Sequence, residues 1–150
     1  MPRIMRNRRG TSLIELMVVL GIMGLVVLFS VPSASRVFDG VQVSAARTTL
    51  VNVYLGARMS ARVSGRMTVL RISQNQVILE RNSVSGAAKD TLSVTDLAKQ
   101  YGVLLSGPDS IRIDPRGMLE TNLLSTVKYV LSRGARTDSV RLSAYGSIRR

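Results

Sequence analysis

Hydrophobic residues run almost without a break from residue 13 to residue 31. The residues that interrupt the run are Glu15, Gly21, Gly24 and Ser30. A membrane-spanning helix needs about 20 predominantly apolar residues, and glycines in such a helix permit close contact with other helices. Pro32 follows at once and predicts a kink or a break. We therefore expect a transmembrane helix over residues 11–32.

After this segment the pattern becomes amphipathic, with apolar residues at spacings of three and four, as on one face of a helix. They are Val43, Ala46, Leu50, Val53, Ala57 and Ala61. A helix is predicted over residues 33–64, with an interruption near Gly40 and a stop at Gly65. Its apolar face is expected to pack on a sheet. Three arginines lie largely off that face and are expected on a solvated surface, with a partner-binding surface as the alternative: Arg47, Arg58 and Arg62.

From residue 66 the apolar period falls toward two, which indicates strands. The segments "RMTVLRI" and "QVILER" predict two strands joined by a hairpin turn at "SQNQ". Further strands are predicted at "SIRI", "STVKYVLS" and "SVRLSAY", and a turn at "DPRG". The segment "NSVSGAAKD" has loop composition, and "TLSVTDLAKQYGVLL" is typical of either a strand or a short helix. Five or six short strands would form one small antiparallel sheet over the helix, which is an α+β fold.

The chain is strongly basic, with 21 Lys and Arg against 9 Asp and Glu and a net charge of +12 over 150 residues. Four of the arginines lie in residues 1–10, and the excess of basic residues survives their removal. Such a balance favours acidic partners such as nucleic acid or anionic lipid. It also places positive charge before the apolar segment, which favours a cytoplasmic N-terminus and a C-terminal domain in the periplasm.

No catalytic site emerges from the composition. The chain has no Cys and no His, which excludes disulfides, Cys- or His-ligated metals and nucleophilic relays built on those residues. The acidic residues are scattered and fall mostly in predicted turns, so no pair of catalytic carboxylates can be assigned. We expect a protein that is not an enzyme and needs no cofactor. Aromatic residues are 4% and Trp is absent, so a base-stacking platform is not expected.

The carboxylate of Glu15 lies where burial of a charge is costly, and ionisable groups at such positions usually have a partner. A secretory signal peptide is one interpretation, because small residues follow the apolar run in "SVPSAS". A plain single-pass anchor is another. A third follows if the chain is cut between Gly10 and Thr11. Glu15 then lies one helical turn below a new α-amino group and can pair with it, or with that of a neighbouring subunit.

This third interpretation fits a known family. The stretch "G-TSLIELMVVLGIMGLVVLFSVP" strongly resembles the class III signal of type IV pilins and type II secretion pseudopilins. The resemblance implies a leader over residues 1–10 that prepilin peptidase removes after Gly10, and N-methylation of Thr11. It also implies that Glu15 is the assembly acid and Pro32 the helix proline, and that the helix enters a filament through the inner-membrane assembly platform. The family usually has Phe where this chain has Thr11.

The C-terminal part is similar to the GspH/FimT group of minor pilins and pseudopilins. The similarity rests on "GARMSARVSGRMTVLRI", "IRIDPRGM" and "VRLSAYGSIR". It implies an amphipathic helix continuation over residues 33–65 and a periplasmic β-rich domain over residues 66–150. The implied function is a structural subunit of a type IV pilus or of a type II secretion pseudopilus, between which the sequence does not decide. A membrane-anchored periplasmic domain outside any filament is an alternative.

Another alternative concerns the basic C-terminus. Some FimT-like pilins bind DNA through a C-terminal Gly-Arg-x-Arg motif, and here Ser147 replaces the first of those arginines. The candidate DNA-binding residues are Arg141, Arg149 and Arg150, to which Arg133 and Arg136 would add positive charge. Phosphate contacts need only such charge. An ordinary solvated basic surface is the competing interpretation, and DNA remains a candidate partner beside the prepilin peptidase and other filament subunits.

Overall fold

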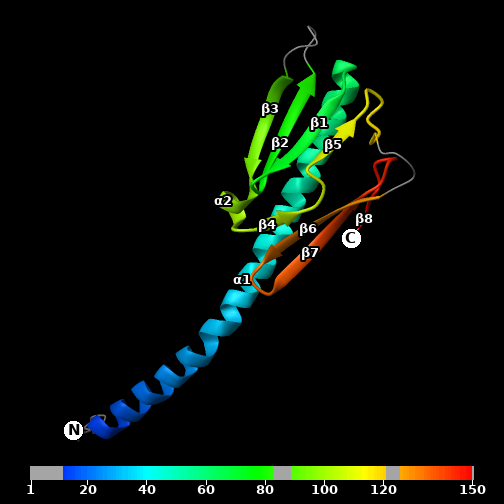
Figure 1. Ribbon diagram of the computed structural model, residues 1–150. Helices are drawn as coiled ribbons and strands as arrows, with labels where there is room; N and C mark the ends of the chain where they lie inside the picture. The colour runs from blue at the N-terminus through cyan, green and yellow to red at the C-terminus, as the bar shows by residue number, and fades with distance from the viewer. Residues whose placement is uncertain (1–11, 83–88, 121–125, 150) are drawn as a thin grey trace, which may run out of the picture. The chain divides into compact units, whose positions relative to one another are not determined.

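The computed structural model describes residues 12–82, 89–120 and 126–149, apart from the side chains of residues 29–34. The chain divides into two compact units, Met1–Ser35 and Arg36–Arg150. One long helix, α1 (Leu13–Ser64), contributes to both units (Figure 1). Everything that follows α1 belongs to the second unit.

Helix α1 continues through the two positions at which the sequence predicted an interruption. It has no break near Gly40, so that prediction is wrong. A glycine inside a helix costs only about 1 kcal/mol relative to alanine, and the buried stripe that begins at Val43 outweighs this cost. Helical backbone also runs across Pro32. The break is therefore absent, while the kink at Pro32 stays a prediction. The helix ends at Gly65, which adopts the left-handed conformation that terminates helices (φ 64°).

The first of two antiparallel sheets has the strand order β3-β2-β1-β5. Its strands are β1 (Thr68–Ser73), β2 (Gln76–Asn82), β3 (Lys89–Asp96) and β5 (Ser110–Ile113). The predicted hairpin at "SQNQ" is confirmed, since Ser73 pairs with Gln76. Its two turn residues, Gln74 and Asn75, both have positive φ, as the tight turns that match strand twist require.

The second sheet has the order β4-β6-β7-β8 (Figure 1). Its strands are β4 (Leu104–Ser106), β6 (Val127–Arg133), β7 (Arg136–Leu142) and β8 (Ile148–Arg149). The α+β class is confirmed, but the expectation of one sheet with five or six strands is wrong. The described residues form eight strands in two sheets. Period-two patterning identifies strands, but it carries little information on which strands pair.

The ambiguous segment between the sheets contains both of the predicted elements. Strand β3 ends at Asp96, and the short helix α2 (Leu97–Tyr101) follows directly. The Asp96 carboxylate caps α2 by accepting a hydrogen bond from the Lys99 N–H at 2.8 Å. This bond, with a second from Gln76, holds the pKa of Asp96 below its usual value. Strand β3 already begins at Lys89, inside the predicted loop, of which residues 83–88 lie outside the described residues.

The core of the second unit lies between α1 and the two sheets. The predicted stripe is buried, with Val53 partly so, and Tyr54 joins it. Both sheets contribute to the same cluster, Leu70 and Ile113 from the first and Tyr129 and Leu131 from the second. The helix therefore holds together two sheets that share no strand. Burial raises the pKa of the Tyr54 and Tyr129 phenols.

The arginines beside this stripe match the expected solvated face only in part: Arg62 is exposed, whereas Arg47 and Arg58 are partly buried. Arg47 lies 3.6 Å from the Asp138 carboxylate on β7. Arg58 donates from Nε to the Gly117 carbonyl at 2.8 Å, and Arg62 donates from Nε to the Arg116 carbonyl at 2.9 Å. Long guanidinium side chains leave the helix at its solvated edge and still reach loops of the sheets.

Candidate functional site

The N-terminal part of α1 exposes a continuous apolar surface. Thirteen large hydrophobic side chains between Leu13 and Leu28 have exposed fractions of 48% to 77%. Burial of such side chains is worth about 1.5–3 kcal/mol each, and a contiguous patch of this size marks a site that contacts lipid or protein. Within the described residues, no helix has a stretch long and apolar enough to cross a membrane. The predicted span of residues 11–32 includes Thr11 and the side chains of residues 29–32, which lie outside the described part.

Glu15 lies in the first turn of this apolar helix, and its side chain is exposed. The Leu16 N–H donates to the Ser12 carbonyl at 3.2 Å, which makes the helix begin beside Ser12. A carboxylate in the first turn is favoured by the partial positive charge of a helix N-terminus. Gly10 and Thr11 lie outside the described residues, so the cleavage site, the methylation of Thr11 and the pairing of Glu15 stay predictions.

A row of three cations crosses the second sheet. Lys128 on β6 is the register partner of Arg141 on β7, and Arg141 is the register partner of Arg149 on β8. All three side chains are exposed, and none forms an ion pair with a carboxylate of the described residues. Like charges that lie directly opposite each other destabilise a sheet. Repulsion within the row therefore destabilises the sheet locally, and a bound anion would reduce that repulsion.

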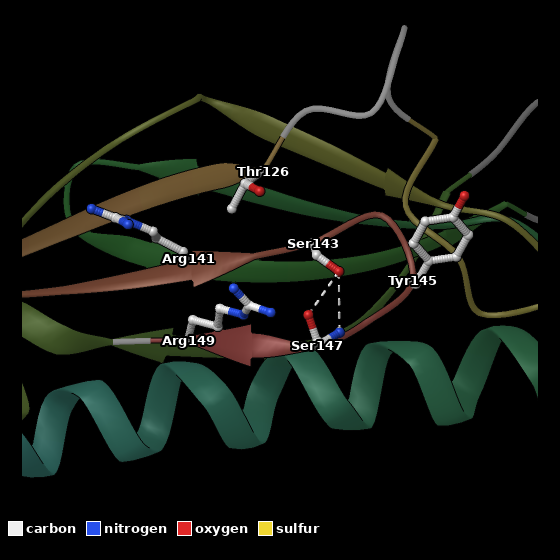
Figure 2. Close-up of a pocket in the computed structure, with 6 residues that line it drawn as sticks. All are labelled: Thr126, Arg141, Ser143, Tyr145, Ser147 and Arg149. Carbon is white, nitrogen blue, oxygen red and sulfur yellow. Dashed lines mark hydrogen bonds between the residues drawn. The ribbon is translucent and has the colours of Figure 1, made fainter.

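Hydroxyl groups lie beside the cation row at the end of the same strands. A pocket of about 390 Å³ brings two of the cations, Arg141 and Arg149, together with Thr126, Ser143, Tyr145 and Ser147. Figure 2 shows the two arginines at one end of this pocket and the Tyr145 ring at the other, with the serines between them. The Ser147 hydroxyl and N–H both approach the Ser143 hydroxyl, at 3.0 and 3.3 Å. Hydroxyls and guanidinium groups together are suited to bind phosphate oxygens.

The turn between β7 and β8 is tightly held. Gly146 adopts φ 85°, and its N–H donates to the Ser143 carbonyl at 2.9 Å. Its carbonyl accepts a hydrogen bond from Arg58 Nη1 on α1 at 3.3 Å. The Ala144 carbonyl accepts from the Leu119 N–H at 3.1 Å. The turn that carries Tyr145 is therefore fixed both by its own backbone and by α1.

Residues 5–31 match the family model described as the prokaryotic N-terminal methylation motif. The fold is similar to the crystal structure of the type IV minor pilin FimU of Pseudomonas aeruginosa, with a TM-score of 0.59 and 13% identity. That match covers 71% of this chain and 86% of FimU. The chain therefore carries the methylation motif at its N-terminus and has a pilin-like fold. No curated protein sequence matches the pilin-like chain significantly, and the GspH/FimT assignment stays a prediction.

The structure of this pilin-like protein separates the predicted basic residues. Arg141 and Arg149 lie side by side, whereas Arg150 is outside the described residues. Arg133 lies at the opposite end of the hairpin and donates from Nε to the Asp39 carboxylate at 2.8 Å. Arg136 is its register partner there. Neither of these two lines the pocket.

The sequence patterns did not identify two residues of the cation row and its pocket. One of them is Lys128. The hairpin turn at Gly134 and Ala135 makes Lys128 the register partner of Arg141, so correct placement of that turn would have found Lys128. Tyr145 is the other, since the low aromatic content gave no reason to expect a base-stacking platform, and Tyr145 lines the same pocket as Arg141 and Arg149. No periodicity marks Tyr145, since it lies in a turn.

Proposed function

We propose that this chain is a minor pilin or pseudopilin, a structural subunit of a type IV pilus or a type II secretion pseudopilus. One observation carries the proposal: the segment that matches the methylation motif is the segment of α1 whose thirteen large apolar side chains are exposed. Such a surface needs lipid before assembly and other subunits after it. The fold, which is similar to that of a minor pilin, supports the same function.

In this proposal the chain is made as an inner-membrane precursor, with its N-terminus in the cytoplasm and its β-rich unit in the periplasm. Prepilin peptidase removes residues 1–10 and methylates Thr11. The assembly platform then moves the helix from lipid into a helical bundle of other pilin or pseudopilin subunits. Glu15 pairs with a new N-terminal amine there, because an unpaired carboxylate among apolar helices costs several kcal/mol.

Mass spectrometry of the mature protein tests this proposal. The expected N-terminus is Thr11 carrying a methyl group, and its formation should depend on prepilin peptidase. Gly10→Val should block the cut. A matched control is Gly24→Ala, because a Cβ at Gly24 meets no atom within 4 Å and the change leaves the motif's cleavage position intact. A mature N-terminus at Met1, or at Arg36 after signal-peptidase cleavage, would refute the proposal.

We infer a second candidate function, DNA binding by the pilin-like subunit, from the row of Lys128, Arg141 and Arg149. The register that aligns three unpaired cations is the specific observation that favours it. Cations that contact phosphates release counterions, so affinity falls steeply with salt, by a slope of about 0.9 for each phosphate contact in duplex DNA.

The test measures binding of the full chain, in neutral detergent, to duplex DNA over a range of salt concentrations. Replacement of the three row residues by Gln should abolish binding or lower the salt slope by about 3. The control replaces three exposed basic residues elsewhere, Lys99, Arg112 and Arg116, and changes net charge equally. If the two triple variants weaken binding to the same extent, the row is not a site.

A further inference from the structure

Tyr145 differs from the other three tyrosines of the chain. Tyr54 and Tyr129 are fully buried, and the Tyr101 hydroxyl is hydrogen-bonded to Thr49 at 2.8 Å. The Tyr145 side chain is 72% exposed and makes no ring contact with any described residue. Its ring thus contributes little to the core of the second unit, although a large aromatic side chain normally gains most from burial.

The backbone that carries the exposed ring is held in a fixed place. The hydrogen bonds of Gly146 and Ala144 fix the backbone on either side of it. A ligand that meets this ring therefore does not have to order the turn first, which lowers the entropic cost of binding. An exposed aromatic on an ordered turn is a surface on which a flat ring can stack.

The ring and the cation row are parts of one surface. Arg141 and Arg149 line the pocket at one end and Tyr145 lies at the other (Figure 2). Adjacent strands place partner residues about 5 Å apart, so the row from Lys128 to Arg149 spans about 10 Å and can contact only a few phosphates. Positive charge that follows a backbone, combined with an aromatic face for a base, is the arrangement that binds single strands.

We propose that this surface binds single-stranded DNA in preference to duplex DNA. Tyr145 stacks on one unpaired base, while Lys128, Arg141 and Arg149 contact backbone phosphates of the same strand. The bases of a duplex are paired and stacked on each other, so the ring reaches a base face only if a base leaves the stack. This inference rests on the second candidate function, DNA binding at the cation row.

The experiment compares three probes of equal length on the full chain in neutral detergent: a thymidine oligonucleotide, a duplex, and an abasic phosphodiester strand. Stacking of one base predicts that the oligonucleotide binds about 5- to 150-fold more tightly than the abasic strand. Tyr145→Ala should remove this advantage and leave duplex affinity unchanged. Tyr145→Phe keeps an aromatic ring and should retain the advantage of the oligonucleotide over the abasic strand. Thermal unfolding of each variant checks that the exposed substitution leaves the fold intact.

The outcomes separate this inference from the function on which it rests. If duplex and single strand bind equally and Tyr145→Ala weakens neither, the stacking proposal is wrong while the cation row still binds DNA. If Tyr145→Ala weakens all three probes alike, the residue supports the turn and the inference also fails. Absence of binding to any probe at low salt overturns both the stacking inference and the DNA-binding function.

Discussion

The guanidinium group of Arg58 on α1 occupies the space that a side chain at Gly146 would need. Arg58 Nη1 donates to the Gly146 carbonyl at 3.3 Å, and a Cβ built at Gly146 would collide with the guanidinium. The same arginine donates from Nε to the Gly117 carbonyl. One helix residue therefore fixes the turn that carries Tyr145 and the loop that follows β5.

Gly146→Ala should lower the free energy of unfolding by about 1–2 kcal/mol, the cost of left-handed backbone for a residue with a Cβ, with a further loss from displacement of Arg58. Chemical denaturation of the full chain in detergent measures the change. Gly56→Ala is the control, because Gly56 is helical and a Cβ there meets no atom within 4 Å. That substitution should stabilise the chain by about 0.5–1 kcal/mol. Equal effects of the two would contradict the proposed role of Gly146.

The ion pair between Asp39 and Arg133 should contribute about 1 kcal/mol to stability. Its side chains are 28% and 34% exposed, so solvent screens only part of the attraction. Arg133 also donates from Nη1 to the Tyr101 carbonyl, so this residue joins α1, α2 and β6. A double-mutant cycle with Asp39→Asn and Arg133→Met isolates the pair. A coupling energy near zero would show that the contact with Asp39 adds nothing to the rest of the packing.

Alkaline pH should destabilise the second unit through its buried tyrosines. Burial raises the pKa of Tyr129, and also that of Tyr54, above the usual value near 10. A raised folded-state pKa gives stability that is complete below pH 10 and is lost as the pH rises above it, because the unfolded chain ionises first. Tyrosinate absorbance should show two phenols that ionise only when the unit unfolds. Tyr129→Phe should retain more stability above pH 10, and identical pH profiles would contradict this explanation.

Glu15→Ala should leave the leader cut intact and strongly reduce incorporation into filaments. The reason is that the variant helix keeps its apolar surface but loses the group proposed to select one register of helix packing. Immunoblots of membrane and sheared-filament fractions measure processing and assembly separately. Ser12→Ala is a nearby control that alters the helix start without removing charge. Normal incorporation of Glu15→Ala would refute the pairing role.

Local patterns predicted most of the elements. The apolar run, the spacing of three and four up to Ala61, and Gly65 as a stop together place α1. The turn at "SQNQ" places the β1–β2 hairpin. These predictions succeed because hydrophobic period and turn chemistry act between residues close in the sequence. Because such patterns are local, they wrongly predicted a helix interruption near Gly40. There, packing of α1 on the sheets outweighs a weak helix propensity.

Three features follow from the amino-acid sequence alone: the apolar helix with its methylation motif, the α+β class and the surplus of positive charge. Three relationships appear only in the folded chain. The strands divide into two sheets, and Arg58 holds the β7–β8 turn. Lys128, Arg141 and Arg149 form one row, whose last two members share a pocket with Tyr145. These relationships join residues up to 88 positions apart. Strand register and packing against α1 create them, and no local preference of the chain encodes such contacts.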